Sequence, residues 1–105
     1  MDGLVRVCLR KKLPKEGEVR EMRAGRRKFC VARLDGEIAV VDGLCPHKDL
    51  PLSEGYIEKG RVVCPWHGWT FDLKTGEQHK GKARVRVFPA AMVDGELLVT
   101  ISPAS

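Results

Sequence analysis

The chain has 105 residues and a mass of 11.7 kDa, which is enough for one domain and excludes a second catalytic module beside it. Its 43% hydrophobic and 31% charged residues are typical of a globular domain, which excludes disorder and membrane insertion. Lys and Arg outnumber Asp and Glu by 19 to 14, so the net charge is +5. Because acids are interspersed among the basic residues and aromatic residues make up 6%, we expect no nucleic-acid or membrane partner. The excess of positive charge is compatible with a partner that has an acidic surface.

The beginning of the sequence carries charges before any apolar run long enough for a signal peptide, and no stretch reaches membrane-spanning length. We therefore expect a cytoplasmic protein. In a reducing cytoplasm, four cysteines are expected as thiols or metal ligands rather than as disulfides.

Short runs rich in Val, Ile and Leu, with alternating apolar and polar residues, recur along the chain between Gly, Pro and Asp turn signals. No segment sustains a helical apolar period, so the sequence predicts an all-β fold. Asp35-Gly36 and Asp94-Gly95 each predict a tight hairpin, because these residues tolerate positive φ, and residues 74–76 predict a third turn. The predicted strands, in chain order, are 4–9, 19–23, 28–34, 37–42, 56–57, 61–64, 70–72, 76–78, 83–88, 90–93 and 96–101.

Residues 43–72 are denser in Pro, Gly, Cys and His than the rest of the chain and contain no long predicted strand. The flanking regions supply nearly all of the β pattern. We therefore expect a β-sandwich or barrel built from both flanks and interrupted by a loop-rich insert. Long loops inside a compact domain are usually functional, so the chemistry is expected in this insert.

Two short packets of cysteine and histidine lie in the insert. Cys45-Pro46-His47 is followed, after sixteen residues, by Cys64-Pro65-Trp66-His67. Thiolate and imidazole suit soft or borderline transition metals, and two loops that each carry one pair can close four ligands around one site. The alternative is two buried cysteines and two hydrogen-bonded core histidines. That alternative does not explain why all four gather in the part of the chain poorest in strand.

The spacing within the first packet bears on the choice of metal. A single zinc ion can be bound by two cysteines and two histidines, but structural zinc packets usually separate their paired ligands by two to four residues. Only Pro46 separates Cys45 from His47. A two-iron site removes this difficulty if the two cysteines bind one iron, the two histidines bind the other, and two sulfides bridge the metals.

These packets resemble the signature of the Rieske [2Fe–2S] family, in which two histidines replace two cysteines on one iron. Residues 45–55 and 64–72 are similar to the two cluster loops of Rieske-type ferredoxins and ring-hydroxylating oxygenases. The resemblance implies one [2Fe–2S] cluster, no catalytic residue, and a cofactor and metal ligand set of Cys45, His47, Cys64 and His67. It also implies a single Rieske domain over residues 1–105, with a Rieske-type antiparallel β-sandwich or barrel base (1–42 and 73–105) and an inserted cluster-binding subdomain (43–72).

The sequence departs from the respiratory members of that family in two ways. Leu50 and Trp66 occupy the positions at which those proteins carry a disulfide, so that bridge cannot form. The respiratory members tend to carry hydroxyl groups at the positions of Trp69 and Phe71, and neither of these side chains has an O–H to donate. Fewer hydrogen bonds to the cluster sulfurs stabilise the reduced state less, so we expect a potential at the low end of the Rieske range, roughly −150 mV.

The remaining cysteines and histidine have simpler interpretations. Cys8 and Cys30 lie outside the loops and are expected as small buried residues on strands. His79 follows a turn with no cysteine nearby in the sequence, so we expect a solvated surface histidine. Apolar residues that either frame the exit of the electron toward a partner or simply pack in the fold are Pro51, Leu52, Trp66, Trp69, Phe88 and Pro89.

The resemblance implies a one-electron carrier and not an enzyme. A Rieske-type ferredoxin passes electrons from a flavin-containing reductase to a terminal oxygenase. An oxygenase active site would need a second iron held by two histidines and a carboxylate, and His79 is the one histidine outside the packets. The alternatives are the small Rieske-like subunit of an assimilatory nitrite reductase, whose large subunit would then be the acceptor, and a structural zinc-binding module.

Overall fold

A computed structural model describes residues 3–46, 50–65 and 68–101 of the chain. The described residues form strands joined by turns and two short 3-10 turns, so the predicted all-β class is confirmed. In chain order the elements are β1 (Gly3–Leu9), η1 (Arg10–Lys12), β2 (Val19–Ala24), β3 (Arg27–Leu34), β4 (Glu37–Asp42), η2 (Leu52–Glu54), β5 (Tyr56–Glu58), β6 (Arg61–Val63), β7 (Thr70–Asp72), β8 (Val87–Phe88), β9 (Ala90–Val93) and β10 (Glu96–Ile101).

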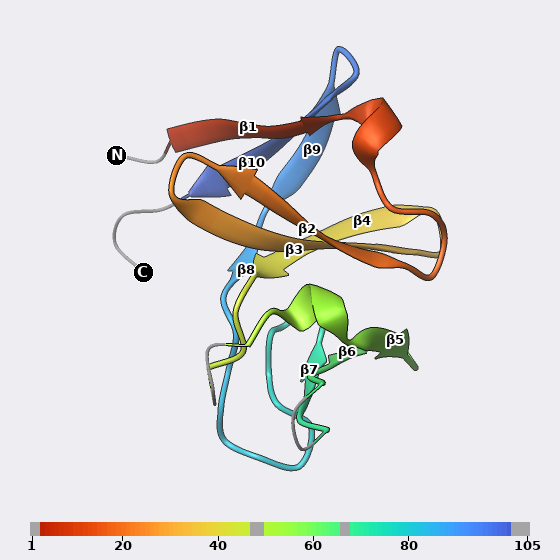
Figure 1. Cartoon of the computed structure of the whole chain (residues 1–105), viewed down its shortest axis with the longest axis vertical. Helices are drawn as coiled ribbons and strands as arrows, with labels where there is room; N and C mark the ends of the chain where they lie inside the picture. Colours follow the sequence, from red (N-terminus) through yellow and green to blue (C-terminus); the bar gives the residue numbers. More distant parts are fainter. Residues whose placement is uncertain (1–2, 47–49, 66–67, 102–105) are drawn as a thin grey trace.

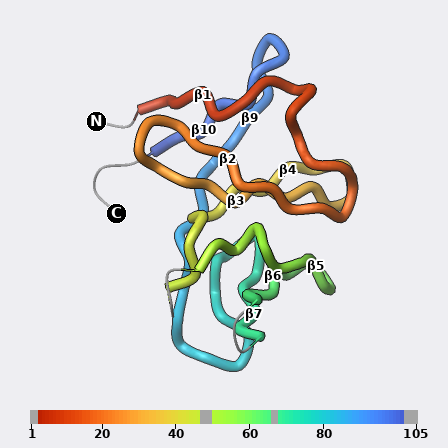
Figure 2. The backbone as a smooth tube through the Cα atoms, in the orientation of Figure 1, coloured from red at the N-terminus to blue at the C-terminus, as the bar shows by residue number. Residues whose placement is uncertain are grey.

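The strands form three antiparallel sheets that are stacked along the long axis of the molecule (Figure 1). The upper sheet in this view has the order β1-β10-β9, the middle sheet β2-β3-β4-β8, and the lower sheet β5-β6-β7. The chain leaves the middle sheet after β4 and returns to it at β8, so the lower sheet is an excursion from the other two (Figure 2). The upper and middle sheets form the expected sandwich.

The middle sheet is buried on both faces, and β3 shows why. Successive side chains on a strand point to opposite faces. Phe29 and Val31 belong to a buried cluster shared with β1 and β10, whereas Cys30 and Ala32 belong to a second buried cluster shared with residues of the lower sheet and its loops. The four consecutive apolar residues of this strand therefore fill two cores. We call the cluster shared with β1 and β10 the base core. We call the cluster shared with the lower sheet and its loops the loop core.

Paired residues of positive φ close three of the hairpins. Asp35-Gly36 joins β3 to β4 and Asp94-Gly95 joins β9 to β10, with φ near +50° at each Asp and near +77° at each Gly. Both predicted hairpins are confirmed. Lys59-Gly60 makes the same kind of turn between β5 and β6, and this hairpin was not predicted from the sequence.

Two predicted strands are wrong in whole or in part. Residues 76–78 make only isolated bridges, Phe71 to Gln78 and Glu77 to Arg84, although the turn before them does form. Of the predicted strand 83–88, only β8 pairs as a strand, against Val40 and Val41 of β4. Backbone hydrogen bonds place residues 76–78 between β7 and residues 83–85, since the Asp72 N–H donates to the Glu77 carbonyl and the Val85 N–H donates to the Gly76 carbonyl. These pairings are too short to form a ladder.

The molecule measures 38 × 31 × 20 Å. Both described ends of the chain belong to the upper sheet, and the cysteine-bearing loops lie in the lower half of the molecule, whose lower tip is the cyan segment after β7 (Figure 2). No helix long and apolar enough to cross a bilayer occurs in the described ranges.

Candidate metal centre

The first cysteine loop leaves the end of β4 and is fixed at its base by backbone hydrogen bonds. The Gly43 N–H donates to the Lys28 carbonyl at 3.1 Å, and a Cβ at Gly43 would lie 2.9 Å from the backbone of Lys28, so only glycine allows this approach. The Asp42 carboxylate accepts a hydrogen bond from the Leu44 N–H at 3.1 Å. The Cys45 N–H then donates to the Leu50 carbonyl at 2.8 Å, which closes the loop.

The second cysteine loop connects β6 to β7. The Cys64 N–H donates to the Trp69 carbonyl at 2.6 Å, and the Thr70 hydroxyl donates to the Gly68 carbonyl at 3.0 Å. Gly68 has a φ of +67°, a conformation that favours glycine, and it turns the chain back toward β7. The strands on either side pair directly, with Val63 opposite Thr70, so the loop is held at both ends.

The two loops have the same construction. In each, a cysteine N–H bonds to the carbonyl of the fifth residue after it, Leu50 in the first loop and Trp69 in the second. The sequence did not predict these two carbonyls, and the packets gave no signal for them, because histidine follows cysteine by two positions in the first packet and by three in the second. Cys45 and Cys64 are both buried and both belong to the loop core. The fold thus brings together the two predicted sulfur donors, which are nineteen positions apart in the sequence.

Three predicted positions of the packets lie outside the described residues. These are His47, Trp66 and His67, which fall within the intervals that the two hydrogen bonds close. Among the described residues, no three His, Cys, Asp or Glu side chains lie close enough together to hold a metal ion. His47 and His67 are not among the residues to which this statement applies.

The other two cysteines lie on strands of the sandwich, as predicted. Cys30 is fully buried in the loop core, where burial and the nearby Glu21 carboxylate raise the pKa of its thiol to about 12. Cys8 lies on β1 and is only half-buried, which differs from the expectation, and its burial raises the pKa of its thiol. None of the four cysteines, all within the described ranges, forms a disulfide.

Several residues expected near the exit have different roles. Leu52 is fully buried in the loop core and Phe88 is buried in the base core, so neither can contact a partner. Pro89 is exposed, and Pro51 and Trp69 are half-buried. His79 is exposed, as predicted.

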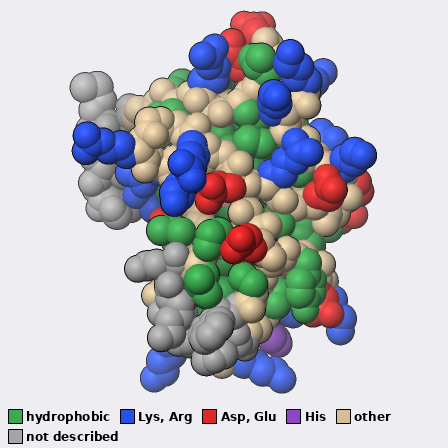
Figure 3. Space-filling view, in the orientation of Figure 1, with side chains coloured by type: hydrophobic (Ala, Val, Ile, Leu, Met, Phe, Trp, Pro, Cys, Tyr) green, Lys and Arg blue, Asp and Glu red, His purple; other side chains and the backbone are tan. Residues whose placement is uncertain are grey.

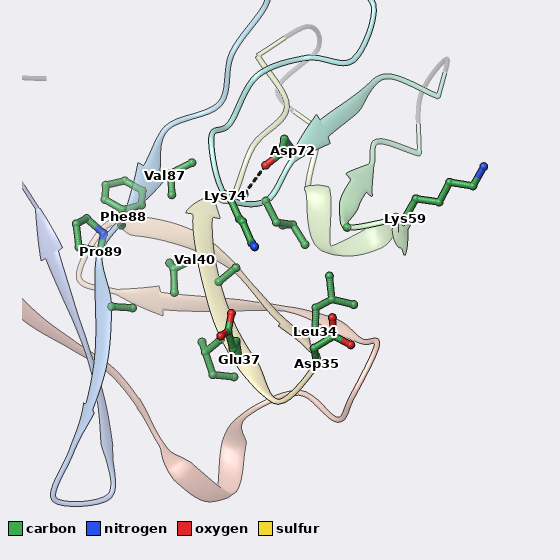
Figure 4. Close-up of a pocket in the computed structure, with 15 residues that line it drawn as sticks. Leu34, Asp35, Glu37, Val40, Lys59, Asp72, Lys74, Val87, Phe88 and Pro89 are labelled. Carbon is green, nitrogen blue, oxygen red and sulfur yellow. Dashed lines mark hydrogen bonds between the residues drawn. The ribbon is translucent and has the colours of Figure 1, made fainter.

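A groove lies apart from the two cysteines of the candidate metal centre. It has a volume of about 880 Å³ and runs between β4, the β5–β6 turn and the segment around β8, with Leu34, Val40 and Phe88 among its lining residues (Figure 4). Neither Cys45 nor Cys64 lines it. At one side of the groove the Asp72 carboxylate accepts a hydrogen bond from the Lys74 N–H, drawn as a dashed line in Figure 4. The groove is therefore separate from the candidate metal centre.

The comparison with known proteins agrees with this geometry. The model of the Rieske [2Fe-2S] domain family matches residues 3–91, and the chain belongs to this family. The anthranilate 1,2-dioxygenase ferredoxin subunit of Burkholderia cepacia is 38% identical over 80 residues, which are 74% of this chain and 74% of that protein. A ferredoxin of Sphingomonas yanoikuyae B1 superposes with a TM-score of 0.83 at 27% identity, over 95% of this chain and all of that one.

Other relatives are larger or share only the fold. The 4beta-methylsterol monooxygenase of Methylococcus capsulatus is 38% identical over 65 residues, but the match spans 51% of this chain and only 18% of that protein. A chain from Mycobacterium tuberculosis assigned as the small subunit of an NADH-dependent nitrite reductase has a TM-score of 0.83 at 21% identity, covering 97% of each chain. The predicted family, fold and cofactor class are confirmed by these comparisons taken together.

The described residues fit the cluster that this family carries. Two thiols lie in one buried core, and each comes from a loop that is closed by the same kind of hydrogen bond. Thiolates are the ligands that iron–sulfur clusters require. The core residues around them are apolar, so water has little access to the sulfur atoms.

Proposed function

We propose that this protein is a one-electron carrier of the Rieske ferredoxin type, with one [2Fe–2S] cluster held by Cys45, His47, Cys64 and His67. The observation that carries the proposal is the pair of equally closed cysteine loops, both of which deliver a buried thiol to one core, in a chain of the Rieske family. The ferredoxin subunit of a dioxygenase, matched over most of its length, supports a carrier rather than a catalyst.

The residues of the chain contribute rigidity and exclusion of water. A [2Fe–2S] cluster supplies a reversible one-electron couple when it is bound. The N–H groups of the two cysteines donate hydrogen bonds to the carbonyls of Leu50 and Trp69. These bonds hold the backbone of each cysteine in place in both redox states. Leu52 and Phe71 are fully buried beside the cysteines and exclude water from that side. Little atomic rearrangement on reduction is what an electron carrier requires.

We further propose a flavin-containing reductase as the donor and a terminal oxygenase as the acceptor, which the name of the related dioxygenase subunit supports. The alternative partner is the large subunit of a nitrite reductase, for which a chain with the same fold is the supporting observation. Co-purification from the native host distinguishes them, because a bound subunit would elute with a large reductase and a carrier would elute alone.

The division of the chain and its location are also proposals. We place the base at residues 1–42 and 73–105 and the cluster-binding insert at 43–72, which the separate sheet of β5, β6 and β7 supports. We place the protein in the cytoplasm, because thiols that bind iron must stay reduced until the cluster is assembled.

The test is anaerobic reconstitution with iron and sulfide, followed by assay of acid-labile sulfide and an EPR spectrum of the dithionite-reduced protein. We expect red-brown protein with bound sulfide and a paramagnetic reduced state, which Cys64→Ser and His67→Ala each abolish. A colourless protein that retains zinc and lacks sulfide would establish the structural zinc module instead.

A further inference from the structure

A hollow lined by basic side chains lies beside the base of the first cysteine loop. Its volume is about 590 Å³, and its lining includes Arg26, Arg27 and Lys28 from the β2–β3 hairpin together with Asp42 and Leu44. We call these five residues the basic hollow. Arg26 and Arg27 are exposed and Lys28 is half-buried. Three cationic side chains therefore face one carboxylate in this lining.

The basic hollow is joined to the loop by covalent and hydrogen bonds. Leu44 immediately precedes Cys45, and the Gly43 N–H donates to the carbonyl of Lys28. The Asp42 N–H donates to the carbonyl of Arg86 at 2.9 Å, which brings a further cationic residue to the same region. A charge placed here acts on whatever approaches the first cysteine loop.

An aromatic ring positions two of the cations of this region. The guanidinium groups of Arg27 and Arg86 lie 5.8 and 4.8 Å from the centre of the Phe88 ring, within the range of cation–π attraction. Elsewhere Arg6, Arg23 and Arg84 each pair with a glutamate, whereas Arg26, Arg27 and Lys28 have no ion-pair partner within the ranges that the structure describes. Their field is left to act on a partner.

The hollow contains one carboxylate, which balances one of its three positive charges. An Oδ1 atom of Asp42 accepts the Leu44 N–H and so serves the loop. The space-filling view shows Lys and Arg side chains on the flank level with the β2–β3 hairpin and again around the lower end of the molecule (Figure 3). Hydrophobic and acidic side chains lie between these two groups in this view.

We propose that the basic hollow is the docking surface for an electron-transfer partner whose contact surface is acidic. The inference rests on the proposed function and adds the place and the charge of the contact. Opposite charges on two proteins raise the rate of productive encounter by factors of about 10 to 1,000 at low salt, and the effect weakens as salt screens it. A basic hollow at the base of the cysteine loop orients the partner toward the buried thiols.

The experiment compares two charge-reversal triples that change the net charge by the same amount. R26E/R27E/K28E alters the hollow, and R10E/K11E/K12E alters the exposed basic turn η1, which lies on the opposite side of the molecule from the β2–β3 hairpin in Figure 1. Each reconstituted protein is reduced and mixed in a stopped-flow instrument with oxidised cytochrome b5, an acidic haem protein that serves as the probe. The second-order rate constant is measured at about 10 mM and about 1 M salt.

We expect the hollow triple to lower the rate constant at low salt at least about tenfold and the η1 triple to lower it less than about threefold. The difference should disappear at high salt. R26Q/R27Q/K28Q should also lower the rate constant at low salt more than R10Q/K11Q/K12Q does, although each loss should be smaller than with glutamate. These neutral variants serve as a control in case a glutamate triple fails to fold. With cytochrome c, a basic haem protein, the hollow triple should raise the rate constant.

Equal losses in the two triples, or a loss that persists at high salt, would overturn the proposal. Hollow-dependent binding to vesicles that contain phosphatidylserine would overturn it too, because the surface would then serve a membrane. The absorption spectrum of the cluster separates this failure from failure of the proposed function: a protein with an intact cluster and equal losses refutes only the docking surface.

Discussion

Three buried thiols share the loop core, but only two of them stand at the head of a loop. Cys45 and Cys64 each begin a segment that a hydrogen bond closes five residues later, whereas Cys30 lies in the middle of β3 between paired strands. Burial alone therefore does not mark a ligand. The position of the thiol relative to a loop does, because only there can a second ligand follow within a few residues.

This contrast gives a matched test at the level of single residues. We expect Cys45→Ser and Cys64→Ser each to lose bound iron and sulfide, because serine replaces a thiolate ligand. Cys30→Ala should keep both and lose only about 1 kcal/mol of stability, the cost of one missing buried atom. Iron and acid-labile sulfide per protein measure the first effect, and urea unfolding measures the second. Loss of the cluster in the Cys30 variant would contradict the assignment.

At the scale of elements, turns with special backbone geometry hold the loops and sheets together. Gly76 and Gly95 both have φ near +80°, but their surroundings differ. A Cβ at Gly76 would collide with the carbonyl oxygen of Val85, whose N–H bonds to Gly76 in return, while a Cβ at Gly95 meets nothing. The segment after β7 therefore depends on glycine for space as well as for conformation.

Two alanine substitutions separate these requirements. Gly95→Ala should cost about 1 kcal/mol, because it adds only the strain of positive φ. Gly76→Ala should cost about 3 kcal/mol or more, because the backbone must also move. Urea unfolding of both variants at neutral pH measures the difference. Equal costs would show that the approach of Val85 to Gly76 does not contribute to stability.

The turn after β7 also predicts a dependence on pH. The Asp72 carboxylate accepts hydrogen bonds from the N–H groups of Thr75 at 3.0 Å and Lys74 at 2.7 Å. The bond from Thr75 is the main cause that lowers the pKa of this carboxyl below its usual range. Since the folded state holds the proton less tightly than the unfolded state, the stabilisation is complete above the usual pKa. It is lost as the pH falls through the lowered value.

Asp72→Ala should therefore destabilise the protein by about 1 kcal/mol at pH 7 and by much less near pH 2. Asp72→Asn, which keeps an acceptor oxygen but has no charge, should be intermediate at pH 7 and should not add to the pH dependence. Thermal unfolding at the two pH values measures both effects. A penalty for the alanine variant that stays the same in acid would contradict the role of the ionised carboxylate.

At the scale of the whole molecule, two layers support a third that carries the chemistry. The base core joins the upper and middle sheets, and the loop core joins the middle sheet to the cysteine loops. Both cores use β3, so the position of the loops is fixed by the sandwich. Phe71 belongs to the loop core and Trp69 packs against it, and neither side chain has an O–H to donate to a cluster sulfur.

We therefore expect a reduction potential at the low end of the Rieske range, roughly −150 mV. The net charge of +5 opposes a low potential, but solvent screens surface charges and makes this the weaker effect. A redox titration monitored by EPR measures the midpoint. A value well above zero would mean that other hydrogen-bond donors reach the sulfurs.

The fold class, two of the tight turns and the family could be predicted from the amino-acid sequence alone. Alternation of apolar residues, Asp-Gly pairs and the two Cys-His packets are local patterns, and local patterns can be read without knowing what lies across the fold. The composition indicated an excess of positive charge. It could not show that Arg26, Arg27 and Lys28 reach the base of the first cysteine loop.

Strand pairing and the membership of each core could be seen only in the folded molecule. Residues 76–78 and 83–86 have strand-like composition, but they pair with each other and with β7 only through short runs of hydrogen bonds and isolated bridges. Leu52 has the appearance of a surface contact in the sequence but is buried in the loop core. Pairing and burial depend on residues far apart in the chain, and that is why the sequence could not determine them.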